Sequence, residues 1–413
     1  MAKIEAEVGK PQGGFMKWID DRFPFTETMK YHITEYYASK NFNFWYVFGV
    51  LAMVVLVIQL FTGIFLTMNY KPAADEAFAS VEYIMRDVQW GWLIRYMHST
   101  GASFFFIVVY LHMFRAMLYG SYKKPRELIW IIGMLIFFVL MAEAFAGYLL
   151  PWGQMSYWGA QVIISLFGAI PGIGESIVEL IRGDYSISDI TLNRFFALHV
   201  IALPLALIGL VFVHIVALHE VGSNNPDGIE IKEHKGPDGV PLDGVAFHPY
   251  HTSKDMVAII IFLMIFSFVL FFAPEMGGYF LEYANFEPAN LKATPEHIAP
   301  VWYFTPFYAI LRAVPDKLWG FILFGLSVVL PVFLPWLDRA RVKSIRYRGW
   351  IYKSALSIFV VTFVALGWLG VQPAEGPYVL AARILSVIYF AFFLLMPYYT
   401  TIDKTKPVPD RVV

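Results

Sequence analysis

Four histidines stand inside long apolar stretches, where a polar side chain needs a partner or a chemical role. His98 and His112 are 14 residues apart in one stretch, and His199 and His214 are 15 apart in another. At 100° and 1.5 Å per residue, each spacing keeps both side chains on one side of a helix, about 21 Å apart along it. Two imidazoles that face each other inside a helix bundle are the ligands of a bis-histidine haem. The spacing therefore predicts two haem sites at two depths.

Glycines repeat the same spacing in the neighbouring stretches. Gly49 and Gly63 are 14 residues apart, and so are Gly133 and Gly147. Glycine lets a helix backbone approach a flat macrocycle closely, although small residues in membrane helices also serve helix packing. Two such pairs favour haem contacts over chance.

Three charged residues lie close to this set in the sequence. Arg95 and Arg115 each stand three residues beyond a histidine of the first stretch. A guanidinium there could bind a haem propionate or extend to lipid headgroups. Glu143 stands four residues before Gly147. It belongs to an outer proton path or bonds to a neighbouring backbone, and the sequence leaves both open.

Eight apolar stretches are long enough, or nearly so, to cross a bilayer core of about 30 Å as helices of about 20 residues. No stretch alternates like a barrel strand, and backbone groups in lipid must be paired internally, so we expect helices. The predicted fold class is all-α integral membrane, with the first four helices bundled around two stacked haems. The stretches are 44–69, 90–114, 128–149, 195–218, 256–273, 318–337, 353–371 and 379–399.

The composition agrees with lipid as the main solvent. Hydrophobic residues make up 58% of the chain and charged residues only 15%, which is less charge than a soluble domain carries. The net charge of −1 and the lack of a basic face argue against a nucleic-acid partner. The chain has no cysteine, which excludes thiolate metal sites, iron–sulfur ligation and thioether-linked haem, so a metal must rest on histidine or carboxylate.

Basic residues in the short loops predict the orientation. They gather after the stretches 90–114 and 318–337, which places those loops, and both termini, on the cytoplasmic side. The stretches 90–114 and 195–218 then both run from outside to inside. His98 and His199 therefore share the outer level, and the other two histidines share the inner level.

The chain divides into four predicted parts. They are a cytoplasmic N-terminal segment (1–43), the haem-binding bundle (44–220), a cytoplasmic loop (221–255) and a C-terminal four-helix part (256–413). The outer connections 150–192 and 274–317 are rich in proline, glycine and aromatic residues, and loops of this length are usually functional or disordered. The segment 233–244 resembles a solvated linker without chemistry.

Six segments in order resemble the cytochrome b subunits of bacterial cytochrome bc complexes, over essentially the whole chain. They are RYMHSTGASFFFIVVYLHMFR (95–115), GYLLPWGQMSYWGA (147–160), NRFFALH (193–199), HEVGSNNP (219–226), FHPYHTSKD (247–255) and PVWYFTPFYAILRAVPDKLWG (300–320). The resemblance implies that His98 and His199 ligate the low-potential outer haem, and that His112 and His214 ligate the high-potential inner haem. It also implies two haems b and a quinone, with ubiquinone as the first expectation.

The family has two quinone sites, and both map onto this sequence. For quinone reduction on the cytoplasmic side, the matching residues are His219, Ser223, Lys254 and Asp255. A histidine and a carboxylate can supply the two protons that a reduced quinone takes up. Aromatic and apolar residues suit the quinol ring at the outer site, although they could equally be core packing. They are Phe145, Tyr148, Met155, Gly159, Ile163, Pro300, Trp302, Tyr303 and Tyr308.

Two features depart from the family's common pattern. The family motif Pro-Glu-Trp-Tyr, whose carboxylate accepts a proton from the quinol, has Val301 in its second position here. Glu296, five residues upstream, replaces a common proline, and we hypothesise that it takes over this role. The spacing of 15 residues exceeds the 14 of the commonest pattern, and a proline kink or π-bulge near Pro204 would absorb the extra residue.

The resemblance also implies the activity and the partners. Quinol would be oxidised outside, one electron going to an iron–sulfur partner and the other through both haems to the inner site, coupled to proton translocation. Without cysteine, the chain would need a Rieske iron–sulfur protein and a cytochrome c-type subunit, in a homodimer in a bacterial inner membrane. Two alternatives stay open, namely a two-haem membrane anchor of a dehydrogenase, which would have fewer spans, and a transporter whose histidines relay protons.

Overall fold

Long apolar helices dominate this computed structural model, which describes residues 14–30 and 35–413. In this described part, eight helices are long and apolar enough to cross a membrane, at the eight predicted places. This confirms an all-α, multi-pass membrane protein. The crossing helices are α3 (Phe48–Thr67), α5 (Gly91–Tyr119), α6 (Glu127–Leu149), α9 with α10 (Asp189–Ala197 and Leu203–Val221), α11 (Thr252–Phe272), α13 with α14 (Lys317–Val329 and Leu334–Leu337), α15 (Trp350–Leu369) and α16 (Gly376–Leu394).

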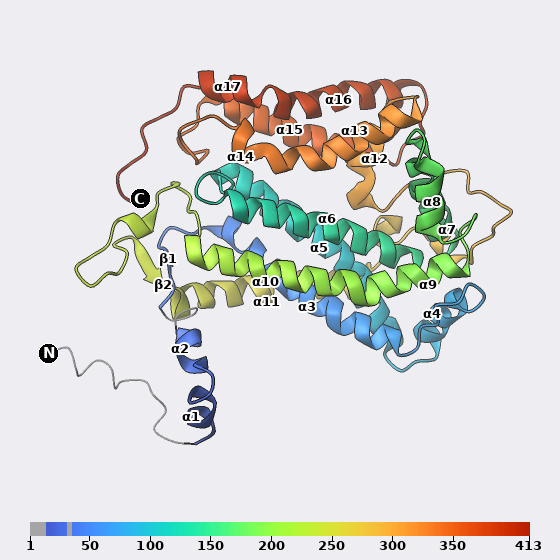
Figure 1. The fold of residues 1–413 in the computed structure, drawn as a ribbon, viewed down its shortest axis with the longest axis horizontal. Helices are drawn as coiled ribbons and strands as arrows, with labels where there is room; N and C mark the ends of the chain where they lie inside the picture. The colour runs from blue at the N-terminus through green and yellow to red at the C-terminus, as the bar shows by residue number, and fades with distance from the viewer. Residues whose placement is uncertain (1–13, 31–34) are drawn as a thin grey trace.

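The helices pack side by side in two groups. Helix α3 packs against α5 and α6 against α10, while α12, α15 and α16 pack on one another. Figure 1 shows α13, α15 and α16 on one side of α6 and α10 on the other. The main hydrophobic core joins the groups and includes the fully buried Phe106, Ile310 and Phe393.

The segments between the crossing helices contain shorter elements. Both long outer connections, which were expected as loops, are largely helical, because α7 and α8 lie in one and α12 lies in the other. These helices are too short to stand out in a span-length hydropathy pattern. The shorter elements are α1 (Phe15–Asp20), α2 (Phe25–Met29), α4 (Ala77–Arg86), α7 (Gln154–Leu166), α8 (Gly174–Arg182), α12 (Thr305–Ala313), α17 (Met396–Ile402), β1 (Tyr37–Ser39) and β2 (Gly244–Ala246).

Strands β1 and β2 pair antiparallel at the end of the bundle that also holds the C-terminus, opposite the end with α4, α7 and α8 (Figure 1). Asp243, just before β2, is buried and forms ion pairs with Lys40 and Arg411. Hydrogen bonds from Arg411 and Lys40 hold the pKa of Asp243 well below its usual range. The segment 233–244 is mostly exposed, as predicted, but its end ties the N- and C-terminal segments together.

A widened turn separates α9 from α10. Residues Leu198–Ala202 form a π-helical turn, in which the N–H of Leu203 donates to the carbonyl of Leu198, five residues back. A π-turn accommodates one residue more than an α-turn. It therefore absorbs the extra residue between His199 and His214, directly before Pro204. This confirms the hypothesis of a π-bulge near that proline.

Candidate functional site

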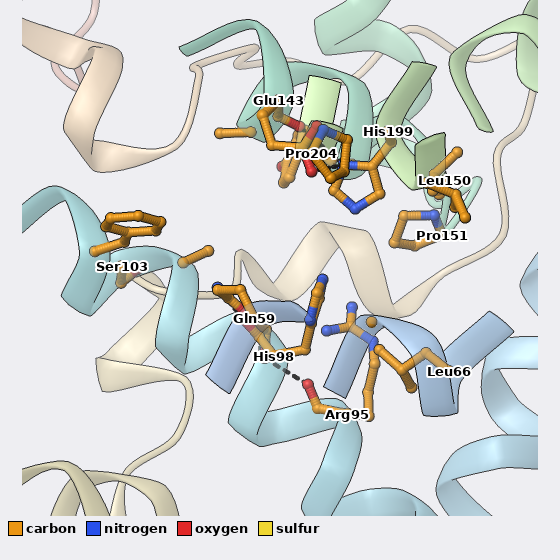
Figure 2. A pocket seen from close by; sticks show the side chains of 18 of the residues that line it. Gln59, Leu66, Arg95, His98, Ser103, Glu143, Leu150, Pro151, His199 and Pro204 are labelled. Atoms are coloured by element: carbon orange, nitrogen blue, oxygen red, sulfur yellow. Dashed lines mark hydrogen bonds and ion pairs between the residues drawn. The ribbon is translucent and has the colours of Figure 1, made fainter. Parts of the chain in front are cut away.

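The outer histidines face each other across the helix bundle. The ring centroids of His98 on α5 and His199 in the π-turn are 6.0 Å apart, and the rings are perpendicular. Two imidazoles on opposite sides of one metal, with bonds of about 2 Å each, would have centroids about 6 Å apart. Figure 2 shows the two rings pointing toward one another from opposite walls of a pocket. The predicted outer pair is thus brought together.

Each outer imidazole has its Nδ1 atom engaged by a neighbouring helix. Nδ1 of His98 lies 2.9 Å from the Thr62 hydroxyl of α3. Nδ1 of His199 lies 3.0 Å from the backbone carbonyl of Glu143 on α6. A hydrogen bond at one ring nitrogen fixes the tautomer and leaves the other free to bind metal. Both Nε2 atoms are therefore available to an iron between them.

The carboxylate of Glu143 also contacts His199, with Oε1 3.1 Å from Nδ1. Its second oxygen is buried and has no hydrogen-bond partner in the described part of the chain. Of the two interpretations that the sequence left open, neither named this contact. Glu143 therefore holds a candidate metal ligand in place from behind.

The inner histidines lie on the same two crossing helices, about four helical turns deeper. His112 on α5 and His214 on α10 are close enough to interact electrostatically. The guanidinium of Arg115 approaches His112, with Nη2 3.5 Å from Nδ1. The structure thus repeats a two-histidine arrangement at the predicted second level.

All four predicted glycines contact the histidines. A Cβ added to any of them would first meet the Cε1 atom of one imidazole on the adjacent helix. The distances would be 3.3 Å for Gly63 and His98, 3.3 Å for Gly49 and His112, 3.4 Å for Gly133 and His214, and 2.3 Å for Gly147 and His199. The glycines make room for the imidazoles, and their approach to a macrocycle stays a prediction.

The two arginines are half-buried cations without acidic partners. Arg95 lines the outer pocket, and Arg115 lies 4.9 Å above the ring of Tyr46. Neither forms an ion pair with any residue that the structure describes, and the Nε atom of Arg115 is buried without a partner. A buried cation needs a counter-charge. Both arginines therefore fit the carboxylates of haem propionates.

One cavity of about 250 Å³ joins the outer histidines to part of the predicted quinol site. Besides His98 and His199, its lining includes Tyr148, Val301 and Tyr303. Tyr303 stacks on Phe106 with centroids 3.9 Å apart, and burial raises its pKa far above the physiological range. Its hydroxyl therefore stays neutral and can donate a hydrogen bond to a ligand.

Other predicted quinol residues do not line this cavity, so their roles stay predictions. Phe145 packs against Phe195, and the hydroxyl of Tyr308 donates to the carbonyl of Ile298. Val301 lines the cavity and is 4% exposed, so the motif position without a carboxylate is an interior one. The predicted residues outside the lining are Phe145, Met155, Gly159, Ile163, Glu296, Pro300, Trp302 and Tyr308, of which Glu296 is exposed.

At the inner end, Tyr36 joins two of the predicted quinone residues. Its ring stacks on His219 with centroids 4.4 Å apart, and its hydroxyl lies 3.2 Å from the Ser223 hydroxyl. The N–H of Phe247 donates to the carbonyl of Tyr36, which ties this group to the segment before α11. The sequence gave no local sign of this role, because Tyr36 is 187 residues from Ser223.

The other two inner residues begin α11. Lys254 is exposed, with its ammonium 4.5 Å above the ring of Tyr250. The carboxylate of Asp255 is half-buried and has no hydrogen bond or ion pair within the described residues. No printed side-chain contact joins either to Ser223, so their shared site with His219 stays a prediction.

Fold and site together define a class: multi-pass membrane proteins whose helices carry paired imidazoles at two depths. Residues 33–222 match the family model described as Cytochrome b/b6/petB, and residues 288–390 match Cytochrome b(C-terminal)/b6/petD. The chain belongs to the cytochrome b family, whose prosthetic group is haem b.

Relatives agree over nearly the whole length. Cytochrome b of Allochromatium vinosum is 63% identical over 407 residues, which are 96% of this chain and 98% of that protein. Cytochrome b of Rhodospirillum rubrum is 49% identical over 399 residues, 96% of this chain and 95% of that one. A chain of a solved structure titled hyperthermophilic respiratory Complex III superposes with a TM-score of 0.87 at 41% identity, over 94% of this chain and 99% of that chain.

Proposed function

We propose that this chain is the two-haem, quinone-reactive subunit of a quinol:cytochrome c oxidoreductase. It oxidises quinol at the outer cavity and reduces quinone at the cytoplasmic side, with electrons carried between these sites and protons moved across the membrane. The observation that carries the proposal is the facing pair His98 and His199, repeated at a second depth by His112 and His214. The similarity to a respiratory Complex III chain supports it.

The residues of the chain have distinct tasks in this proposal. The four histidines hold two haems b, and Arg95 and Arg115 neutralise their propionates. When bound, haem b supplies a one-electron carrier at each depth, so the two electrons of a quinol can leave separately. Tyr148 and Tyr303 hold the quinol ring in the outer cavity. His219 and Asp255 deliver protons to quinone at the inner site.

Partners complete the activity. The chain has no cysteine and so cannot ligate an iron–sulfur cluster by thiolates. A Rieske iron–sulfur protein therefore takes the first electron, and a cytochrome c-type subunit passes it on. The complex is a homodimer in a bacterial inner membrane, with ubiquinone as its quinone and both termini of this chain in the cytoplasm.

Adding a short-chain ubiquinol to the purified, oxidised complex tests this function. We expect the absorption spectrum of two b-type haems with different midpoint potentials, both reduced by the quinol. A protein without b-type haem would contradict the proposal and favour the proton-relay transporter. Quinol oxidation that runs equally fast without the iron–sulfur protein would contradict it too, and would favour the dehydrogenase anchor.

Replacing Tyr36 with alanine should weaken quinone binding at the inner site. The change removes the ring stacked on His219, and aromatic stacking contributes about 0.5–1.5 kcal/mol, which corresponds to roughly 2- to 12-fold in affinity. Tyr36→Phe keeps the stack and loses only the hydroxyl near Ser223, so it should bind more nearly as the wild type does. The measurement is the quinone dependence of re-oxidation of pre-reduced b haem. Equal affinity in Tyr36→Ala and wild type would exclude Tyr36 from the site.

A further inference from the structure

A glutamate directly behind the outer cavity is placed to take a proton from it. Glu282 lies between α11 and α12, and its Oε2 accepts a 2.7 Å hydrogen bond from the hydroxyl of Tyr148. Tyr148 lines the cavity, as do Phe280 and Leu281, which precede Glu282 in the chain. One hydrogen bond therefore separates this carboxylate from the wall that would contact a ligand.

The segment that carries Glu282 is fixed in place. It continues into the turn Tyr283–Phe286, where the Asn285 side chain accepts a 2.9 Å hydrogen bond from the N–H of Ser156 on α7. Asn285 also lines the cavity. The contact between Glu282 and Tyr148 thus belongs to a packed connection rather than to a free loop.

The surroundings of Glu282 suit a group that exchanges protons near neutral pH. Within the described residues its carboxylate has no ion pair, and the titratable groups that face it are Tyr148 on α6 and Tyr303 in the turn Trp302–Phe304. Burial raises the pKa of Glu282 to about 7, although the hydrogen bond from Tyr148 opposes the rise. The carboxylate is then about half ionised at pH 7.

We propose that Glu282, acting through the hydroxyl of Tyr148, accepts one proton from the quinol that is oxidised in the outer cavity. The inference rests on the proposed function. The quinol hydroxyl gives its proton to the oxygen of Tyr148 as Tyr148 passes its own to Glu282, so Tyr148 ends unchanged and Glu282 ends as the neutral acid. The two electrons leave to the two one-electron acceptors of the proposed function. The second proton goes to the iron–sulfur partner that takes the first electron.

Other carboxylates at this end lack the same connection. Glu296 is exposed and does not line the cavity. Glu275 accepts a 3.1 Å hydrogen bond from the hydroxyl of Tyr96, but neither residue lines the cavity. Glu275 therefore offers a matched control, since it pairs with a tyrosine in the same connection without reaching the cavity.

The test is the pH dependence of quinol oxidation by the complete complex. Because the ionised form of Glu282 accepts the proton, the wild-type rate should rise with pH through about 7. Glu282→Gln should lower the rate by about 10²-fold and abolish the rise, because removing a positioned base costs on the order of 10²–10⁴-fold. Glu282→Asp should restore part of the rise, and Glu275→Gln should keep the wild-type rate and profile.

Each outcome decides the matter. A Glu282→Gln complex with the wild-type rate and pH profile would overturn the inference, as would loss of the rise in Glu296→Gln alone. Intact haem spectra and midpoint potentials in Glu282→Gln show that the site has kept its shape. If that variant loses haem, Tyr148→Phe decides instead, because it keeps the ring and removes the relaying hydroxyl. A wild-type complex whose haems quinol cannot reduce would refute the proposed function itself.

Discussion

Replacing His98 with alanine should remove one of two b-type components from a redox titration, and His112→Ala should remove the other. A haem held by two imidazoles loses half of its bonds to the protein when one imidazole is deleted. The remaining histidine cannot replace it, since the two levels are about 21 Å apart along the helix. The measurement is the reduced-minus-oxidised spectrum followed as a function of potential, in which wild type shows two components and each variant one.

The pairing of the histidines can be tested in the same experiment. His98 faces His199, so His98→Ala and His199→Ala should lose the same component, while His112→Ala and His214→Ala lose the other. His297→Ala, at an exposed position in the outer connection, is the control and should keep both. If His98→Ala and His199→Ala lost different components, the two residues would not share a metal.

The histidine sites could be predicted because their signals are local in the sequence. A span of about 20 apolar residues shows a membrane helix, and a spacing of 14 or 15 residues within it shows which side chains share a face. Even the π-turn at Leu198–Ala202 was foreseeable, since the extra residue stood next to Pro204. Hydropathy and periodicity therefore sufficed for the crossing helices and their ligands.

The quinone sites could be predicted only in part, because they depend on contacts between distant segments. Tyr36 contacts His219 and Ser223 through a strand pairing that no local pattern announces. Glu282 has no motif around it, and its importance follows only from the hydroxyl of Tyr148, 134 residues earlier in the chain. Conversely, Glu296 attracted attention through its sequence neighbours, and the structure leaves it exposed. Short motifs identify the family more reliably than they identify proton paths.

Substituting Gly147 with alanine should remove the outer haem from most of the purified protein. The added Cβ would stand 2.3 Å from Cε1 of His199, closer than two carbon atoms can approach without a shift. The imidazole has little room to retreat, because Nδ1 is bonded to the backbone of Glu143. Overpacking of this kind costs about 1–3 kcal/mol, and here the strain falls on a metal ligand. The measurement is the haem-to-protein ratio together with the redox titration.

Other glycines supply a graded comparison, because alanine by itself favours the helix and any loss must come from the contact. Gly209→Ala, on the helix of His214, meets no atom within 4 Å and should keep both haems at their normal potentials. Gly63→Ala, with 3.3 Å to His98, should shift the outer component without removing it. If Gly209→Ala lost haem as readily as Gly147→Ala, the cause would be general disruption of the membrane helices. If Gly147→Ala kept both haems at normal potentials, then His199 would not be held as tightly against α6 as its contacts indicate.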